Sequence, residues 1–293
     1  MLDKNSEQLL YQMFYDIDEM CRVLDSQERL SAGEAARKVP RMRMSESELM
    51  TILCFYHYSG YKCFGYYYER MVLGEMLSFF PGAVGYRRFV QLIGRVAQRL
   101  YLFARVLCQQ SRQDGIFFAD SKKLPGCDNR RIHANQVFKG VAAYGKSSTG
   151  WFYGLKLHLV VNNLGEIVRF QFTAANVADN NKNVLDKLLS GLKGKCFADK
   201  GYLTQHFEHF FQQGIQVVTK VRKNMKNALL SLHDKLWLKK RALIESVNDL
   251  LMSVFDIDHT RHRSPWNALT HALAGIVAYA YYPQKPSAFI NME

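Results

Sequence analysis

The sequence predicts an α/β protein with an all-helical region over residues 1–110 and a mixed sheet flanked by helices over residues 111–293. Apolar residues recur at helical spacing through the first region, and from residue 115 onward short apolar or alternating runs give the order β-β-β-α-β-α-β-α-α. That order is typical of an antiparallel meander leading into parallel α/β units. The chain has 293 residues, 48% hydrophobic and 22% charged, and this composition excludes a disordered or low-complexity protein.

Helix signals are clear in the first region. Ser45 and Glu48 form a capping box that opens the apolar run Leu49–Tyr58. Further helices are expected over residues 66–79, where Pro81-Gly82 follows, and over residues 86–109.

Strand signals begin at Gly115. Strands are expected at Gly115–Ala119, Trp151–Val161, Ile167–Phe172, Gly194–Ala198 and Gln216–Lys220. The second and third of these form a hairpin through the turn Asn162–Gly165. Helices are expected at about 179–189, 204–213 and 236–255, and a last apolar helix from Pro265 to about Tyr281.

The net charge of +13 points to a polyanionic partner. It is uneven: the basic excess is +2 over residues 1–110, +7 over 111–220 and +4 over 221–293. An excess that serves solubility alone is the alternative. Six single cysteines without a C-x-x-C motif, no evident secretory signal and a longest apolar stretch of 11 residues predict a cytoplasmic protein that spans no membrane.

Two strands end in the same tripeptide, Phe118-Ala119-Asp120 and Phe197-Ala198-Asp199. Carboxylates at the carboxyl edge of a sheet lie where α/β folds place their ligands. If the strands are parallel neighbours, the two carboxylates face one site, and a hard divalent cation such as Mg²⁺ relieves their repulsion. The alternative is that each aspartate caps the following turn.

A third acid is expected from the helix around Glu245. Glu245 points away from the apolar ridge that contains Leu243, and Arg241 precedes it by one turn. Three carboxylates can hold two metal ions for an in-line phosphodiester displacement. A surface ion pair with Arg241 is the alternative.

These residues resemble the bacterial insertion-sequence transposases of the DDE class. The resemblance covers residues 115–267 and rests on Asp120, Gly154-x-Lys156-x-His158, Ala175–Asp179, Asp199-Lys-Gly-Tyr202 and Arg241-x3-Glu245. It implies a ribonuclease H-like catalytic domain with Asp120, Asp199 and Glu245 as catalytic and metal-binding residues, two Mg²⁺ ions that Mn²⁺ can replace, and double-stranded DNA as partner.

The third-acid motif departs from the family pattern. Leu238 stands where many relatives have Tyr, and Met252 where they have Lys. The alternative third acids are Asp234, Asp249, Asp256 and Asp258.

Basic residues near these motifs are candidate DNA contacts. The segment Thr260–Ser264 precedes the last helix, whose free N–H groups favour a phosphate. A polar loop, or a solvated helix face for any single arginine, is the alternative. The candidate DNA-binding residues are Lys156, Lys200, Arg241, Arg261, His262, Arg263, Arg87 and Arg88.

The sequence as a whole predicts a transposase that binds the terminal inverted repeats of a mobile element through residues 1–110. It cuts them by Mg²⁺-dependent hydrolysis and joins the 3′-hydroxyl to target DNA, as a homodimer or larger assembly on DNA. A nuclease that does not join strands and a non-catalytic DNA-binding protein of the same fold are the alternatives.

Overall fold

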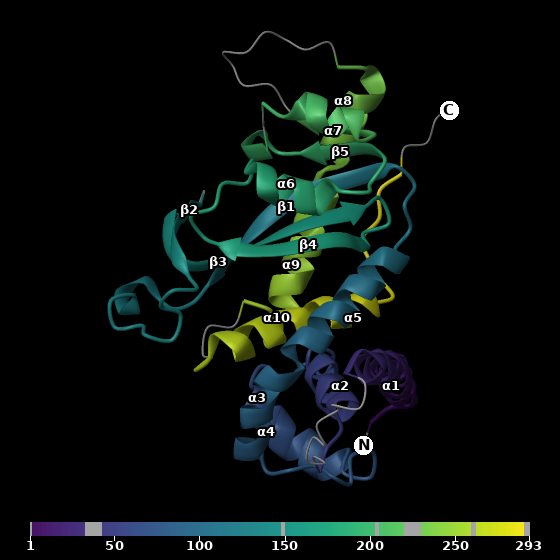
Figure 1. The fold of residues 1–293 in the computed structure, drawn as a ribbon, viewed down its shortest axis with the longest axis vertical. Helices are drawn as coiled ribbons and strands as arrows, with labels where there is room; N and C mark the ends of the chain where they lie inside the picture. Colours follow the sequence, from purple (N-terminus) through teal and green to yellow (C-terminus); the bar gives the residue numbers. More distant parts are fainter. Residues whose placement is uncertain are drawn as a thin grey trace. The chain divides into compact units, whose positions relative to one another are not determined.

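The chain forms two compact units in a computed structural model (Figure 1). The structure describes residues 2–32, 43–147, 150–202, 205–219, 230–258 and 262–289. Unit 1 contains residues 1–104, 254–256 and 266–279, and unit 2 contains residues 105–253, 257–265 and 280–293. The chain therefore leaves unit 1 and later returns to it.

Unit 1 is helical, as predicted. Its helices are α1 (Lys4–Ala32), α2 (Glu46–Tyr56), α3 (Phe64–Tyr67), a π-helical turn (Tyr68–Glu75), α4 (Tyr86–Leu92), a 3-10 turn (Ile93–Val96), the start of α5 (Ala97–Gln110) and most of α10 (Pro265–Ala280). The capping box of α2 is confirmed: the Glu48 backbone N–H donates to Ser45 Oγ (3.1 Å), and the Ser45 N–H donates to Glu48 Oε2 (2.6 Å). The assignment of DNA binding to this helical region stays a prediction.

Helix α10 belongs to the core of unit 1. Every residue from Thr270 to Tyr279 is buried, as expected of a helix that is apolar on all sides. Asn267 Nδ2 donates to the carbonyl of Val90 (3.2 Å), and the His271 ring lies 4.7 Å from that of His57. The last helix of the sequence thus completes the first unit.

Unit 2 is built on one mixed sheet. In its described residues the sheet has six strands: β1 (Ile116–Pro125), β2 (Ala143–Ser147), β3 (Gly150–Asn162), β4 (Ile167–Ala174), β5 (Gly194–Ala198) and β6 (Ile215–Thr219). The order is β2-β3-β1-β5-β6, with β4 also paired to β3. Strands β1, β5 and β6 are parallel, and the other pairs are antiparallel. The predicted meander followed by parallel α/β units is confirmed.

Two strand predictions needed correction. Strand β1 does not end at Asp120 but continues to Pro125, because residues 117–125 pair antiparallel with β3. Strand β2 was not predicted; it is a five-residue edge strand with few apolar residues. The extension of β1 and the presence of β2 both depend on pairing with β3 and not on the local pattern of apolar residues.

Helices cover both faces of the sheet. Alternation along β1 sends Phe117 and Ala119 into a core formed with α6 (Lys182–Leu189) and α7 (Phe207–Gln212). On the other face, Phe118 packs against Trp237 of α8 (Leu232–Lys240), with ring centroids 6.0 Å apart. Helix α9 (Ala242–Ser253) packs on β1 on this same face, hereafter the α9 face.

The helix predicted over residues 236–255 is two helices. Arg241 is the C-cap of α8, and α9 starts at Ala242. The break lies one turn before Glu245 and separates the two helices that cover the α9 face.

Gly154 allows the backbone of β3 to lie very close to that of β1. A Cβ atom at this position of β3 would lie 2.2 Å from the carbonyl oxygen of Leu124 in β1. Only glycine allows the two backbones to approach this closely. Lys156 and His158, which follow it, are thereby fixed in their register against β1.

No helix in the described part of the chain has the length and apolar character needed to cross a lipid bilayer.

Candidate active site

Asp120 and Asp199 each directly follow the last residue pair of the parallel register between β1 and β5. The parallel pairing of β1 and β5 ends at Ala119 and Ala198, so the two aspartates are the next residues on neighbouring strands. Neighbouring strands are about 4.8 Å apart. The predicted parallel pairing of the two Phe-Ala-Asp strands is confirmed.

Asp120 is a largely buried carboxylate on the α9 face. Asn248 Nδ2 donates a 2.8 Å hydrogen bond to Asp120 Oδ2. Burial is the main cause that raises the pKa of Asp120 to about 6. A hydrogen bond from the Ser121 backbone and the charge of Arg241 lower this pKa, and the charges of Asp179 and Glu245 raise it. The ionised form of Asp120 is therefore destabilised where it stands.

Asn248 is a site residue that the sequence reasoning missed. Its side chain is 1% exposed and lies in line with Ile244 and Leu251 on the buried side of α9. Its amide oxygen Oδ1 has no hydrogen-bond partner among the described residues. The signal was present: an asparagine replaces an apolar residue in the i, i+4, i+7 ridge of this helix, and a buried polar side chain needs a reason.

Glu245 lies in the first turn of α9, where its carboxylate is 54% exposed. Arg241 Nη2 donates to Glu245 Oε1 at 2.6 Å, so the predicted pair is present. The charge of Glu245 also contributes to the raised pKa of Asp120. The structure thus places Glu245 within electrostatic reach of Asp120, with its oxygen atoms open to solvent.

The four alternative third acids lie in different surroundings. Asp234 is 6% exposed and pairs with Lys195 Nζ at 2.7 Å. Asp249 is exposed on α9 and lies 3.3 Å from Lys122 Nζ. Asp258 is half-buried, and Asp256 belongs to unit 1.

A polar network lies on the opposite face of the sheet. Asp179 accepts hydrogen bonds from Ser121 Oγ (2.9 Å) and Lys156 Nζ (3.1 Å). His158 is buried, lies 2.9 Å from Thr173 Oγ1 through Nε2, and burial lowers its pKa to about 4. Two motifs of the sequence, Gly-x-Lys-x-His and the segment that ends in Asp179, therefore meet in one network behind Asp120.

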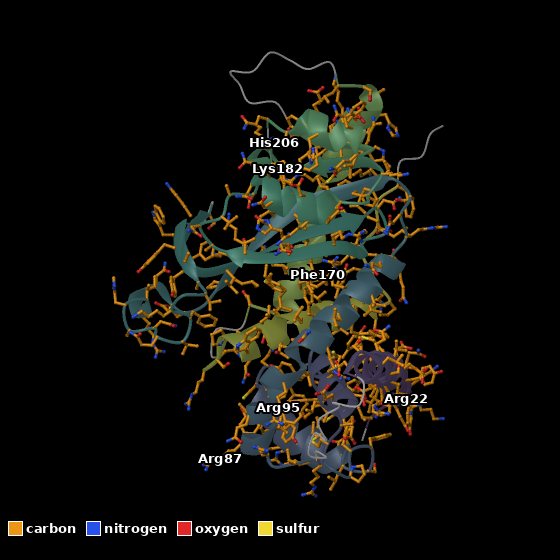
Figure 2. All side chains as sticks on the ribbon, in the orientation of Figure 1. Arg22, Arg87, Arg95, Phe170, Lys182 and His206 are labelled. Atoms are coloured by element: carbon orange, nitrogen blue, oxygen red, sulfur yellow. The ribbon has the colours of Figure 1, made fainter. Side chains whose placement is uncertain are left out.

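The other candidate DNA contacts are placed as follows. Lys156 is engaged inside this network, and Arg241 is engaged by Glu245. The side chains of Lys200, Arg263, Arg87 and Arg88 are exposed, and His262 is half-buried. Arg87, labelled in Figure 2, and Arg88 lie on α4 of unit 1. Arg261 lies outside the described residues.

The acids are not gathered into a metal cage. Among the described residues, no three His, Cys, Asp or Glu side chains come together in a group that could hold a metal ion. The donor set nonetheless fits a hard cation. Asp120 is a largely buried carboxylate whose pKa is raised in part by the charge of Glu245, and the unpartnered Asn248 Oδ1 adds a neutral oxygen donor beside it.

A comparison with models of known protein families identifies the family of this chain. The family model described as the transposase DDE domain matches residues 110–265, which is more than half of the chain. The chain belongs to the transposase DDE domain family. No curated protein matches the chain.

Membership of the transposase DDE domain family agrees with the fold. The matched residues contain the whole sheet and helices α6 to α9, in the element order of a ribonuclease H-like domain. Transposases of this family act on DNA and generally use divalent metal ions, so a transposase-type function follows for this chain. The match ends where α10 begins, and the helices of unit 1 lie outside it.

Proposed function

We propose that this transposase binds the ends of an insertion sequence, cleaves them by Mg²⁺-dependent hydrolysis and joins the freed 3′-hydroxyl to target DNA. The observation that carries the proposal is the register of the sheet, which makes Asp120 and Asp199 neighbours within the family-matched region. Two Mg²⁺ ions held there would activate a water molecule and stabilise the leaving oxygen atom.

The protein residues have separate roles in this proposal. Asp120 and Asp199 bind metal from adjacent strands, and Glu245 completes the set from α9. Asn248 holds the Asp120 carboxylate in one orientation through its 2.8 Å hydrogen bond. Arg241 limits the movement of Glu245 and lowers the local negative charge.

The test of the proposal is strand cleavage by the Asp120→Asn variant. This change removes a metal-binding oxygen with little change in size, so cleavage should be lost while DNA binding remains. Cleavage at a near wild-type rate would exclude Asp120 from the active site. A donor with defined ends in the same assay separates a transposase from a nuclease, because only a transposase forms joined products.

The third ligand is tested by comparing Glu245→Gln with Asp249→Asn. Both side chains are exposed and lie four residues apart on α9, so neither change should affect folding strongly. Loss of cleavage in Glu245→Gln alone supports Glu245. Full activity in Glu245→Gln and none in Asp249→Asn would move the role to Asp249.

DNA binding is expected to depend on charge. The basic excess of +13 implies contacts with phosphates, so affinity should fall steeply as salt increases. An affinity that does not change between low and physiological salt would show that the excess has another purpose. We further propose that the protein acts in the cytoplasm as a dimer or larger assembly on DNA.

A further inference from the structure

The β2–β3 hairpin presents an exposed aromatic and basic surface that has no role in the active site described above. Tyr144 is 47% exposed and Trp151 is 62% exposed. Lys146 Nζ lies over the Trp151 ring, 5.8 Å from its centroid. Register places these side chains on one face, because Tyr144 pairs with Tyr153 and Lys146 pairs with Trp151.

Basic residues surround this face. Arg130, Arg131 and Lys139 are exposed in the segment between β1 and β2, where Asp128 is the one acidic residue. No carboxylate of the described residues pairs with Arg131, Lys139 or Lys146. In Figure 1 this segment and β2 extend to the left of the sheet. An exposed surface of this charge is complementary to a polyanion.

The basic segment is fixed to the hairpin. Asn129 Nδ2 donates to the carbonyl of Trp151 (2.8 Å), and Tyr153 Oη donates to the carbonyl of Phe138 (3.1 Å). These bonds hold the segment that carries Arg130 and Arg131 against the strand that carries Trp151, and Arg130 Nε lies 3.6 Å from Asp128 Oδ1. We name Tyr144, Lys146, Trp151, Arg130 and Arg131 the hairpin surface.

The hairpin surface lies on the same face of the sheet as Asp120. Asp120 pairs with Leu159 of β3, and residues 151 and 159 of that strand point to the same side. They are eight residues apart, which is about 26 Å along the strand at 3.3 Å per residue. At 3.4 Å per nucleotide this distance is about eight base pairs of DNA.

We propose that the hairpin surface binds the substrate DNA about eight base pairs from the bond that Asp120 acts on, with Trp151 stacked on an unpaired base and the arginines on phosphates. Aromatic stacking on a base is independent of sequence, and basic side chains beside it follow the backbone. The distance from the hairpin surface to the cut rests on the proposed function, whereas the contact between the hairpin surface and DNA does not. A second copy of this chain on the unpaired edge of β2 is the competing occupant.

The test is the affinity of Trp151→Ala for a duplex oligonucleotide with one unpaired base, measured in EDTA so that no cleavage occurs. Affinity should fall about 5- to 150-fold, and Trp151→Phe should restore most of it. Phe211→Ala is the matched control, because Phe211 is also exposed (66%) on unit 2 but lies on helix α7 and not on the hairpin. This control should bind DNA as the wild type does.

The contributions of charge and of stacking to DNA affinity are distinguished by how the affinity depends on salt. Lys146→Ala should reduce the slope of log affinity against log salt by about one, whereas Trp151→Ala should leave the slope unchanged. In a Trp266→Phe background the remaining tryptophans are Trp151 and the buried Trp237, so quenching on addition of the oligonucleotide should report Trp151.

Three results would overturn the inference. Wild-type affinity of Trp151→Ala, or a loss equal to that of Phe211→Ala, would exclude Trp151 as a DNA contact. A shift in the sedimentation of Trp151→Ala from dimer to monomer would make the hairpin a subunit interface. These results leave Asp120-dependent cleavage intact. Failure of the wild-type protein to bind any DNA would instead overturn the proposed function, and this inference with it.

Discussion

The two Phe-Ala-Asp strands have the same local sequence but end in different surroundings. After Asp120 the strand continues for five residues, and the carboxylate is largely buried and held by Asn248. Strand β5 ends at Ala198, just before Asp199. A 3-10 turn begins at Lys200, and the side chain of Asp199 is exposed. One carboxylate of the pair is therefore held by the fold, whereas its neighbour is open to solvent.

This asymmetry suits a site that binds a metal ion and a large substrate together. Under the proposed function, Asp120 would define the position of the ion and Asp199 would adjust when DNA binds. The predictions below compare the two aspartates, or the residues that make them different.

The largest effect is expected on catalysis, where the two aspartates should behave alike. Asp120→Asn and Asp199→Asn should each abolish Mg²⁺-dependent cleavage, because each removes a ligand from the shared site. Glu208→Gln, an exposed acid on α7, is the control and should cleave normally. Cleavage by Asp199→Asn at a near wild-type rate would leave Asp120 without its proposed partner.

The second effect concerns Asn248, which orients only Asp120. Asn248→Ala should reduce cleavage about 10- to 100-fold and raise the Mg²⁺ concentration needed for half-maximal activity, as losses of outer-shell partners do. Ser246→Ala changes an exposed residue of the same helix and should have no effect. An unchanged Mg²⁺ requirement in Asn248→Ala would reduce Asn248 to a packing residue.

The third effect is on stability, where the two aspartates should differ. At pH 8 without metal, Asp120→Asn should increase the free energy of unfolding by about 1–3 kcal/mol, because it removes a charge whose ionisation is opposed by burial. Asp199→Asn should change it by less than about 0.5 kcal/mol, since that side chain is exposed. Urea denaturation of both variants measures the difference.

The pH dependence of stability follows from the raised pKa of Asp120. The folded pKa of Asp120, about 6, lies above its ordinary value of 3.8, so between these values the folded protein holds a proton that the unfolded chain has released. The contribution of Asp120 to stability should therefore fall as pH rises from about 4 to 6. The difference in the free energy of unfolding between Asp120→Asn and the wild type should grow over this pH range. A constant difference would mean that the pKa of Asp120 is not raised by folding.

The smallest effect is expected at the exposed pair of Arg241 and Glu245. Glu245→Gln should lower the free energy of unfolding by about 0.3–0.5 kcal/mol, which is usual for an i, i+4 ion pair on a helix. Thermal melting at low and high salt measures this, because salt should remove the difference. A loss above about 2 kcal/mol would show that the pair holds α8 and α9 together.

The parts of the fold that could be predicted are those with a local cause. Ser45 and Glu48 cap α2 through bonds within one turn, and Gly165 has a φ of +73° in the turn between β3 and β4, a conformation that favours glycine. The apolar runs before Asp120 and Asp199 predicted their strands for the same reason.

The parts that could not be predicted have a distant cause. Residues 121–125 are Ser-Lys-Lys-Leu-Pro, which contains no apolar run, and they form a strand through their pairing with β3. The burial of Asp120 depends on Asn248, which is 128 residues away in the sequence. The sequence could therefore predict that Asp120 and Asp199 follow neighbouring strands, but it could not predict how buried each carboxylate is.

The return of α10 to unit 1 constrains how the molecule is made. The ten buried residues Thr270–Tyr279 are synthesised after the whole sheet of unit 2, so the first unit cannot complete its core while the ribosome is still translating the catalytic region. A fragment that ends near residue 110 lacks this helix and leaves the surface it covers open to water. A chain truncated there therefore lacks both the buried residues that complete unit 1 and the whole sheet of unit 2.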